Sequence, residues 1–182
     1  MTNTVTAPLP LVAGRWPLDA NHSRVGFSIR HLGVAKVRGL FRDLDATLDI
    51  GETLADTSIA ATVALASIDT ANAERDAHVR SADLLDVDHR STMTFVSTAI
   101  TGSGSDWSLL GDLTIGEVTR PMRFVVEFGG IADFVDGTRH AGFEATGELR
   151  RKDFGLDFGP LGAFLGDVVK IDLDLEFIEP QP

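Results

Sequence analysis

Residues that can transfer protons or hold anions crowd into the stretch ERDAHVR, which contains Arg75, Asp76 and His78. A histidine close to a carboxylate titrates near neutral pH and can act as a general acid or base. The stretch DANHS adds His22 shortly before the first expected strand. One interpretation is a polar collar in which His22, Arg75 and His78 contact the head group of a ligand. The other is an enzyme whose acid–base site joins Asp76 to these three residues.

A structural interpretation explains the same residues without any ligand. On a helix, Asp76 and Arg80 lie four positions apart and predict a surface ion pair worth roughly 0.3 kcal/mol. A network of this kind pins the segment to the rim of the fold. The residue types alone do not choose among the three interpretations.

The metal-binding and catalytic motifs with recognisable spacing are absent. The chain has five histidines and no cysteine, so a metal site needs histidine and carboxylate ligands. Asp86, Asp88 and His89 are close in sequence, but they fall between a helix and a strand, which indicates a turn. The HExxH, GxSxG, GxxxxGK and GxGxxG patterns do not occur. We therefore predict no catalytic residue, no metal site, no cofactor, and a protein that is not an enzyme.

Charge and hydropathy exclude some partners and compartments. The formal net charge is -11, with basic residues scattered along the chain. It repels nucleic acid and acidic lipid headgroups, so we expect no nucleic-acid partner. No apolar run approaches the roughly 18 residues of a membrane span, so the protein is not expected to be membrane-integral. Residues 1–15 lack the basic start and apolar core of a secretory signal; we expect a flexible tail there and a cytoplasmic protein.

Apolar and polar residues alternate through most of the chain, and this period of two predicts strands with one buried face. The phase slips at Arg42-Asp43, which indicates a β-bulge or a bend between two strands. We expect an all-β domain over residues 16–180, in which about eight antiparallel strands close into an up-and-down barrel. The alternating segments are 24–31, 37–50, 59–65, 93–100, 107–115, 122–128, 141–149 and 169–177.

A polar crossover, residues 67–95, separates two groups of strands. Thr70 or Asn72 can cap a short helix there, with Glu74 and Asp76 in the first turn, where the helix dipole favours negative charge. This segment is the one polar, helix-prone interruption of the strands. We therefore expect one end of a bound ligand to lie near it.

The interior of the expected barrel is suited to a cavity. Barrels of about eight strands are either packed solid or open enough to hold one small ligand, and the number of small inward residues favours the second. The apolar stretch 154–166, FGLDFGPLGAFLG, is too rich in glycine for a regular strand or helix. Beside a barrel mouth it is either a lid or a plug. The small inward residues are Gly39, Ala46, Ala61, Gly111, Ala145 and Gly147.

Several motifs resemble the YceI-like family of polyisoprenoid-binding, lipocalin-like proteins. They follow the family's order from about Trp16 to Glu179, which makes the resemblance specific and nearly complete. The matching segments are WPLDANHSRVGFSIRHLG, VRGLF, SIDT, ERDAHVRSADLLD, GDLTIGEVTRPM, RRKDFGL and GDVVKIDLDLE.

The resemblance implies an eight-stranded antiparallel barrel, commonly a homodimer, with a long apolar tunnel for an isoprenoid chain such as that of a quinone or a polyprenyl compound. Together with the small inward residues, it indicates non-catalytic binding, carriage or sequestration of such a lipid. The alternative is an enzyme that acts on a lipid-like substrate with a His/Asp/Arg site at the barrel mouth. Many members of the family are exported to the periplasm, whereas we expect this protein to be cytoplasmic. The head-group candidates are His22, Arg75 and His78. The tunnel-lining candidates are Phe27, Ile29, Phe41, Val63, Leu65, Phe95, Leu113, Phe124, Val126, Phe143 and Phe154.

Overall fold

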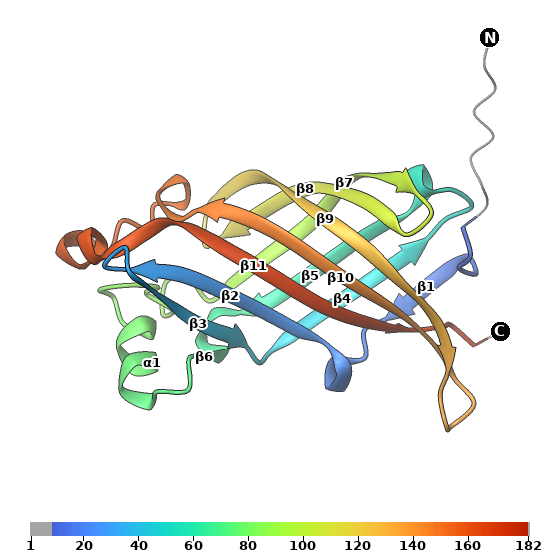
Figure 1. Cartoon of the computed structure of the whole chain (residues 1–182), viewed down its shortest axis with the longest axis horizontal. Coiled ribbons are helices and arrows are strands. Elements are labelled where there is room, and N and C mark those ends of the chain that lie inside the picture. The colour runs from blue at the N-terminus through green and yellow to red at the C-terminus, as the bar shows by residue number, and fades with distance from the viewer. Residues whose placement is uncertain (1–8, 182) are drawn as a thin grey trace, which may run out of the picture.

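Alternating segments of the sequence form the strands of one antiparallel sheet. The computed structural model describes residues 9–181 and contains one α-helix among the strands (Figure 1). The sheet order is β1-β4-β5-β7-β8-β9-β10-β11-β2-β3-β6. The strands are β1 (Gly14–Pro17), β2 (Arg24–His31), β3 (Ala35–Phe41), β4 (Leu44–Ile50), β5 (Ser58–Ala64), β6 (Ile68–Asp69), β7 (Thr92–Ser103), β8 (Asp106–Ile115), β9 (Val118–Asp133), β10 (Arg139–Arg150) and β11 (Leu165–Ile178).

The strand count is eleven, and the expected count of about eight is wrong. The segment 37–50 is two strands, because the chain bends at Arg42-Asp43 between β3 and β4. A two-residue strand, β6, lies inside the polar crossover. A further short strand, β1, lies at the start of the described chain and pairs with β4. Short strands like these leave too few residues for a visible alternation.

The antiparallel sheet curls into a half-barrel, in which the two edge strands, β1 and β6, do not pair with each other. β3 pairs with β2 and β6, whereas β4 pairs with β1 and β5. The ladder continues across the bend, since the Ala64 amide donates to the Asp43 carbonyl at 3.0 Å. On the other side, Leu18 bridges Phe177 of β11. Residues 35–39 of β3 keep one side without a partner strand, because β6 pairs only with Leu40 and Phe41.

The described part of the expected N-terminal tail is packed against the sheet. Residues 1–8 lie outside the described residues. Leu11 is buried, and the Trp16 indole is fully buried and donates to the Val12 carbonyl at 2.9 Å. Residues 9–15 therefore differ from the tail expected for residues 1–15, because Leu11 and Trp16 have apolar surface to bury.

The crossover contains α1 (Ala73–Arg80), which begins as its sequence predicts. The Asn72 side chain caps it by accepting from the Arg75 amide at 2.9 Å, and Glu74 and Asp76 lie in the first turn. Short 3₁₀ helices complete the connections. They are η1 (Ala20–His22), η2 (Leu54–Asp56), η3 (Leu65–Ser67), η4 (Arg151–Phe154) and η5 (Gly159–Phe164).

Three of the small inward residues make room for aromatic rings. A methyl group on Gly39 would lie 2.6 Å from the Phe27 ring, and one on Gly147 would lie 2.9 Å from the Phe124 ring. A methyl group on Gly111 would clash with the Phe95 ring. Such contacts are too short for real carbon atoms, so the space beside these glycines is already occupied. Any cavity in the barrel therefore lies beside other residues.

Candidate ligand-binding site

The barrel encloses a cavity of about 400 Å³, which we call the outer chamber. Strands β2, β3 and β11 form its wall, and the crossover and the segment 154–166 close its end. Its lining is almost wholly apolar. His31 and Phe164 belong to the lining and are themselves exposed, so the chamber reaches the surface at this end, which we call the mouth. The apolar lining residues include Phe27, Ile29, Val37, Phe41, Leu65, Val79, Leu84, Leu85, Leu156, Phe158, Leu161, Leu165 and Val169.

A second cavity of about 120 Å³, the inner chamber, lies deeper between β4, β5 and strands β7 to β11. Aromatic rings shape it: Phe95 meets Phe124 edge-on with centroids 5.4 Å apart, and Trp107 lies 5.6 Å from Phe143. Ala61 and Ala145 also line it. These two alanines, unlike the glycines, leave space that no ring fills.

The two chambers adjoin at a waist made of Val25, Met93 and Ile171, which line both. Methionine is unbranched and flexible, so Met93 can change its rotamer at low cost. The interior is therefore a two-part apolar space along the barrel, with its wider part at the mouth.

Ten of the eleven tunnel-lining candidates lie on these chambers. The outer chamber has Phe27, Ile29, Phe41 and Leu65. The inner chamber has Val63, Phe95, Leu113, Phe124, Val126 and Phe143.

Phe154 lines neither chamber. It borders a separate hollow of mixed polarity between η4 and strands β9, β10 and β11. Its side chain is buried, whereas the buried Arg151 lines the outer chamber.

The tunnel-lining candidates leave out the lining that comes from residues 79–85 of the crossover and from the glycine-rich segment. Val79, Leu84 and Leu85 come from the crossover, and Leu161 and Phe164 come from the glycine-rich segment. In the glycine-rich segment the apolar content was a usable signal, because it favours a lid or a plug at the barrel mouth. The position of an irregular segment over the mouth depends on tertiary contacts that no local pattern encodes.

Arg75 and His78 both line the outer chamber at its edge. The Arg75 guanidinium donates to the Thr70 hydroxyl and to the Thr70 carbonyl, each at 2.7 Å. His78 is about half exposed and lies 3.3 Å from the Asp83 carboxylate. These side chains therefore supply polar groups where the chamber meets α1.

Asp76 has a structural role in the crossover. Its carboxylate is buried and accepts from the Thr70 amide at 2.9 Å and from the Thr70 hydroxyl at 2.5 Å. Arg80 instead donates to the carbonyls of Ala66 and Ile68, so the predicted Asp76–Arg80 ion pair is wrong. These hydrogen bonds hold α1 on β6, because buried polar groups need partners.

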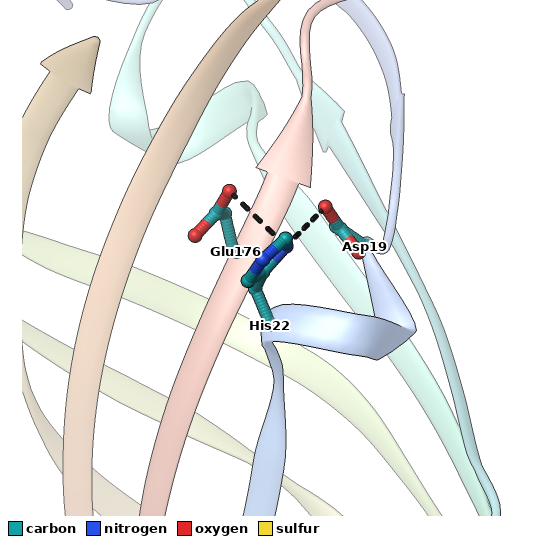
Figure 2. A group of neighbouring side chains, drawn as sticks. All are labelled: Asp19, His22 and Glu176. Atoms are coloured by element: carbon teal, nitrogen blue, oxygen red, sulfur yellow. Dashed lines mark hydrogen bonds and ion pairs between the residues drawn. The ribbon is translucent and has the colours of Figure 1, made fainter. Parts of the chain in front are cut away.

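His22 lies apart from Arg75 and His78. It precedes the start of β2, whereas the mouth lies at the other end of this strand, and eight residues at about 3.3 Å each span roughly 25 Å. Its Nδ1 atom lies 2.8 Å from Asp19 and 4.0 Å from Glu176 (Figure 2). The hydrogen bond with Asp19 raises the pKa of His22 and lowers that of Asp19.

Asp19, His22 and Glu176 are the group of metal-ligating residue types that converges most closely within residues 9–181. The buried His140 also approaches it, with Nδ1 2.6 Å from Glu176. Each imidazole thus has a carboxylate partner, and the geometry is that of ion pairs that tie η1 to β10 and β11. At the crossover, His89 is likewise 2.9 Å from Asp86 in a turn, as its sequence predicts.

The fold and its interior define a lipocalin-like antiparallel barrel with a two-chambered apolar core. The family model described as "YceI-like domain" matches residues 16–177. The chain belongs to the YceI-like family. It is 36% identical over 166 residues to Protein YceI of Escherichia coli O17:K52:H18, covering 88% of this chain and 87% of that one.

Solved structures share the fold. A YCEI protein of Campylobacter jejuni has a TM-score of 0.74 and 27% identity, over 84% of this chain and 90% of that one. A protein of Saccharophagus degradans, described as a polyisoprenoid binding domain implicated in plant cell wall breakdown, has a TM-score of 0.71. It is 15% identical, over 91% of this chain and 98% of that one. Among the described residues, no helix has the length and hydropathy needed to cross a membrane.

Proposed function

We propose that the protein binds a polyisoprenoid or similar long-chain lipid inside its barrel and carries or sequesters it without changing it. The observation that carries the proposal is the pair of adjoining chambers, whose lining is almost wholly apolar. The outer chamber, at about 400 Å³, falls in the roughly 300–1,000 Å³ range of ligand pockets. The structural neighbour described as a polyisoprenoid binding domain supports the same class of ligand.

The physical driving force is the burial of hydrocarbon. Each CH₂ group removed from water contributes about 0.8 kcal/mol, so a chain of several isoprene units binds tightly without polar contacts. The width and length of the two chambers then select the ligand. Affinity should rise with chain length until the inner chamber is filled.

The polar end of the ligand belongs at the edge of the outer chamber. Arg75 and His78 line that edge, and His78 is the more available because Thr70 already engages the Arg75 guanidinium. His22 lines neither chamber, so we assign the head group to Arg75 and His78 alone.

The enzyme interpretation needs His22, Arg75, Asp76 and His78 in one place. His22 is paired with Asp19 away from the mouth, and the Asp76 carboxylate is engaged by Thr70. The four side chains therefore do not form a shared acid–base site in this structure, and the carrier interpretation has the better geometric support.

The first test is occupancy. We expect mass spectrometry of an organic extract from protein purified from its native host to find an isoprenoid or long-chain lipid. Adding a quinone with an isoprenoid tail should quench Trp107, which lines the inner chamber, and spare the sealed Trp16. The Trp16→Phe and Trp107→Phe variants separate the two signals. No extracted lipid together with no quenching of Trp107 would refute the proposal.

The second test fills the inner chamber. Ala61 faces this chamber, whereas its neighbour Ala60 is exposed on the same strand. Ala61→Leu should weaken the binding of a long-chain quinone about tenfold, because the side chain occupies space that the tail needs. A quinone too short to pass the waist should bind as before, and Ala60→Leu is the matched control. Equal affinities in both variants would place the ligand elsewhere.

A further inference from the structure

The basic residues are spread along the chain, but one stretch of the sequence contains several of them and no acidic residue. From Arg24 to Arg42 the chain contains no Asp or Glu, although it has 27 acidic residues in all. This interval forms β2, the turn at Gly33 and β3. The β2–β3 turn lies at the mouth, at the left end of the molecule in Figure 1.

Four cations at this end have no partner. Arg30, Lys36, Arg38 and Lys152 form no ion pair or side-chain hydrogen bond with any described residue, whereas every other Arg and Lys side chain does. Arg30 stands directly opposite Lys36 in the ladder. Like charges in that position destabilise a sheet, so folding does not explain the pair.

Large apolar side chains project beside these cations. Leu32 is 56% exposed, Val34 is 81% exposed and Phe164 is 51% exposed. The two loops are joined, because the Leu32 amide donates to the Phe164 carbonyl at 2.8 Å. Phe164 also lines the outer chamber. We call Leu32, Val34 and Phe164 the mouth tip.

We propose that the mouth tip docks on the surface of an anionic lipid bilayer. Leu32, Val34 and Phe164 enter the interfacial layer, and the four unpartnered cations contact lipid phosphates. The inference rests on the proposed function, because a long-chain lipid taken from a bilayer would then enter the barrel directly through the mouth.

The net charge of -11 does not prevent this contact. Electrostatic fields are screened beyond about 8 Å at physiological ionic strength. The charges near the mouth tip therefore determine whether it is attracted to an anionic bilayer. The carboxylates on the adjoining segment are Asp153, Asp157 and Asp167, and Arg150 already pairs with Asp167 at 3.2 Å. Over β2, β3 and residues 150–167, the four unpartnered cations outnumber Asp153 and Asp157. The crossover at this end adds Glu74, Asp83, Asp86 and Asp88, of which Asp83 pairs with His78 and Asp86 with His89.

The opposite end of the barrel provides the contrast. In the β9–β10 turn, Val135 is 95% exposed and Phe134 is 42% exposed. Asp133 and Asp136 flank them. This tip is at least as apolar, but Asp133 is paired with Arg139 at 3.6 Å, Asp136 adds a negative charge, and none of the four unpartnered cations lies there to attract an anionic bilayer. Apolar exposure alone would select both ends, whereas charge complementarity selects the mouth.

The test is cosedimentation of the purified full-length protein with vesicles. Vesicles containing about one third phosphatidylglycerol should bind it about tenfold better than pure phosphatidylcholine vesicles, and added salt should weaken the binding. The double variant Arg30→Glu/Lys36→Glu and the single variant Val34→Glu should each lose most of this binding. Val135→Glu, the matched control, should bind as the wild type does. Thermal unfolding checks that each variant is folded, and Arg30→Gln/Lys36→Gln replaces the first variant if it is not.

Ligand binding is measured separately, without vesicles, by quenching of Trp107 with a detergent-dispersed quinone whose isoprenoid tail is long enough to pass the waist. Normal quenching without vesicle binding would overturn the docking and leave the proposed function intact. Vesicle binding without quenching would refute the proposed function while supporting a membrane contact. Equal binding to both vesicle types, or a Val34→Glu change that only dissociates a dimer, would overturn the docking inference.

Discussion

Aromatic rings and small residues divide the barrel interior between packed and empty space. The Phe27, Phe95 and Phe124 rings occupy the space beside Gly39, Gly111 and Gly147. The alternation of the sequence correctly places these glycines inward, but it does not say which neighbour fills the gap. That choice depends on the register between strands, which is set by distant residues.

Adding a methyl group at Gly111 tests whether the space beside this residue is already filled. Gly111→Ala should lower the free energy of unfolding by about 1–3 kcal/mol, because the new Cβ would lie 2.5 Å from the Val96 carbonyl oxygen and clash with the Phe95 ring. Gly142, also in a strand, has nothing within 4 Å of such a Cβ. Gly142→Ala should be neutral or stabilise the protein by about 0.5 kcal/mol. Urea unfolding measures both, and equal effects would contradict this account.

The ion pair of His22 and Asp19 makes part of the stability depend on pH. The pKa of His22 lies above its ordinary value of 6.5, chiefly through the hydrogen bond with Asp19. The contribution of His22 is therefore complete below pH 6.5 and is lost as the pH rises through the raised pKa. Asp19 has a lowered pKa, so its contribution is present above pH 3.8 and is lost at lower pH as the pH falls through that lowered value.

Asp19→Asn should therefore return the pKa of His22 toward 6.5, as an NMR titration of its ring protons would show. The asparagine oxygen can still accept from the Asn21 amide, as the carboxylate does at 3.0 Å. The stability difference from the wild type should be largest between about pH 4 and 6.5 and should shrink above this range. His89, whose pKa is raised by Asp86, is the internal control and should titrate as before. An unchanged His22 titration would show that Asp19 is not its partner.

Among the structural elements, the segment 154–166 depends on one buried side chain. The Arg151 guanidinium donates to the carbonyls of Leu156, Asp157, Gly162, Leu165 and Gly166, at 2.6 to 3.2 Å. It also lies 5.0 Å from the centre of the Phe158 ring. A segment rich in glycine has a high entropy when free, so these bonds hold it over the outer chamber.

Arg151→Lys should loosen this segment, because an ammonium group has three donors and lacks the planar fork that reaches several carbonyls. Hydrogen exchange followed by mass spectrometry should show faster exchange in peptides covering residues 155–166. Peptides from β7 and β8 should exchange as in the wild type. A uniform acceleration over the whole chain would mean that Arg151 supports the barrel and not the segment.

The predictable elements are those whose pattern is local. Alternation located the long strands, and Asn72 with an acidic first turn located α1. The short strand β6 has two residues and no pattern of its own, so only pairing with β3 creates it. The candidate site follows the same rule. Alternation assigned the strand residues on the chamber walls, whereas Leu161 and Phe164 lie in an irregular segment without a local pattern.

On the scale of the whole molecule, an occupied interior should stabilise the fold. A ligand that binds only the folded state contributes about 2.7 kcal/mol at a hundredfold excess over its Kd. For a chain of this size, each kcal/mol corresponds to about 2–4 °C in Tm. Protein stripped of lipid on a hydrophobic resin should therefore melt about 5–10 °C below the loaded protein. Adding an isoprenoid quinone should restore the Tm, and a quinone without a tail should not; restoration by both would assign the effect to the head group.

The charge contrast between the two ends of the elongated barrel has a kinetic consequence. With unpartnered cations at one tip and carboxylates at the other, the molecule carries a dipole along its length. A charged surface exerts a torque on such a dipole within the screening distance. Diffusing copies would turn end-on before they touch, so a larger share of collisions would be productive without any gain in contact strength.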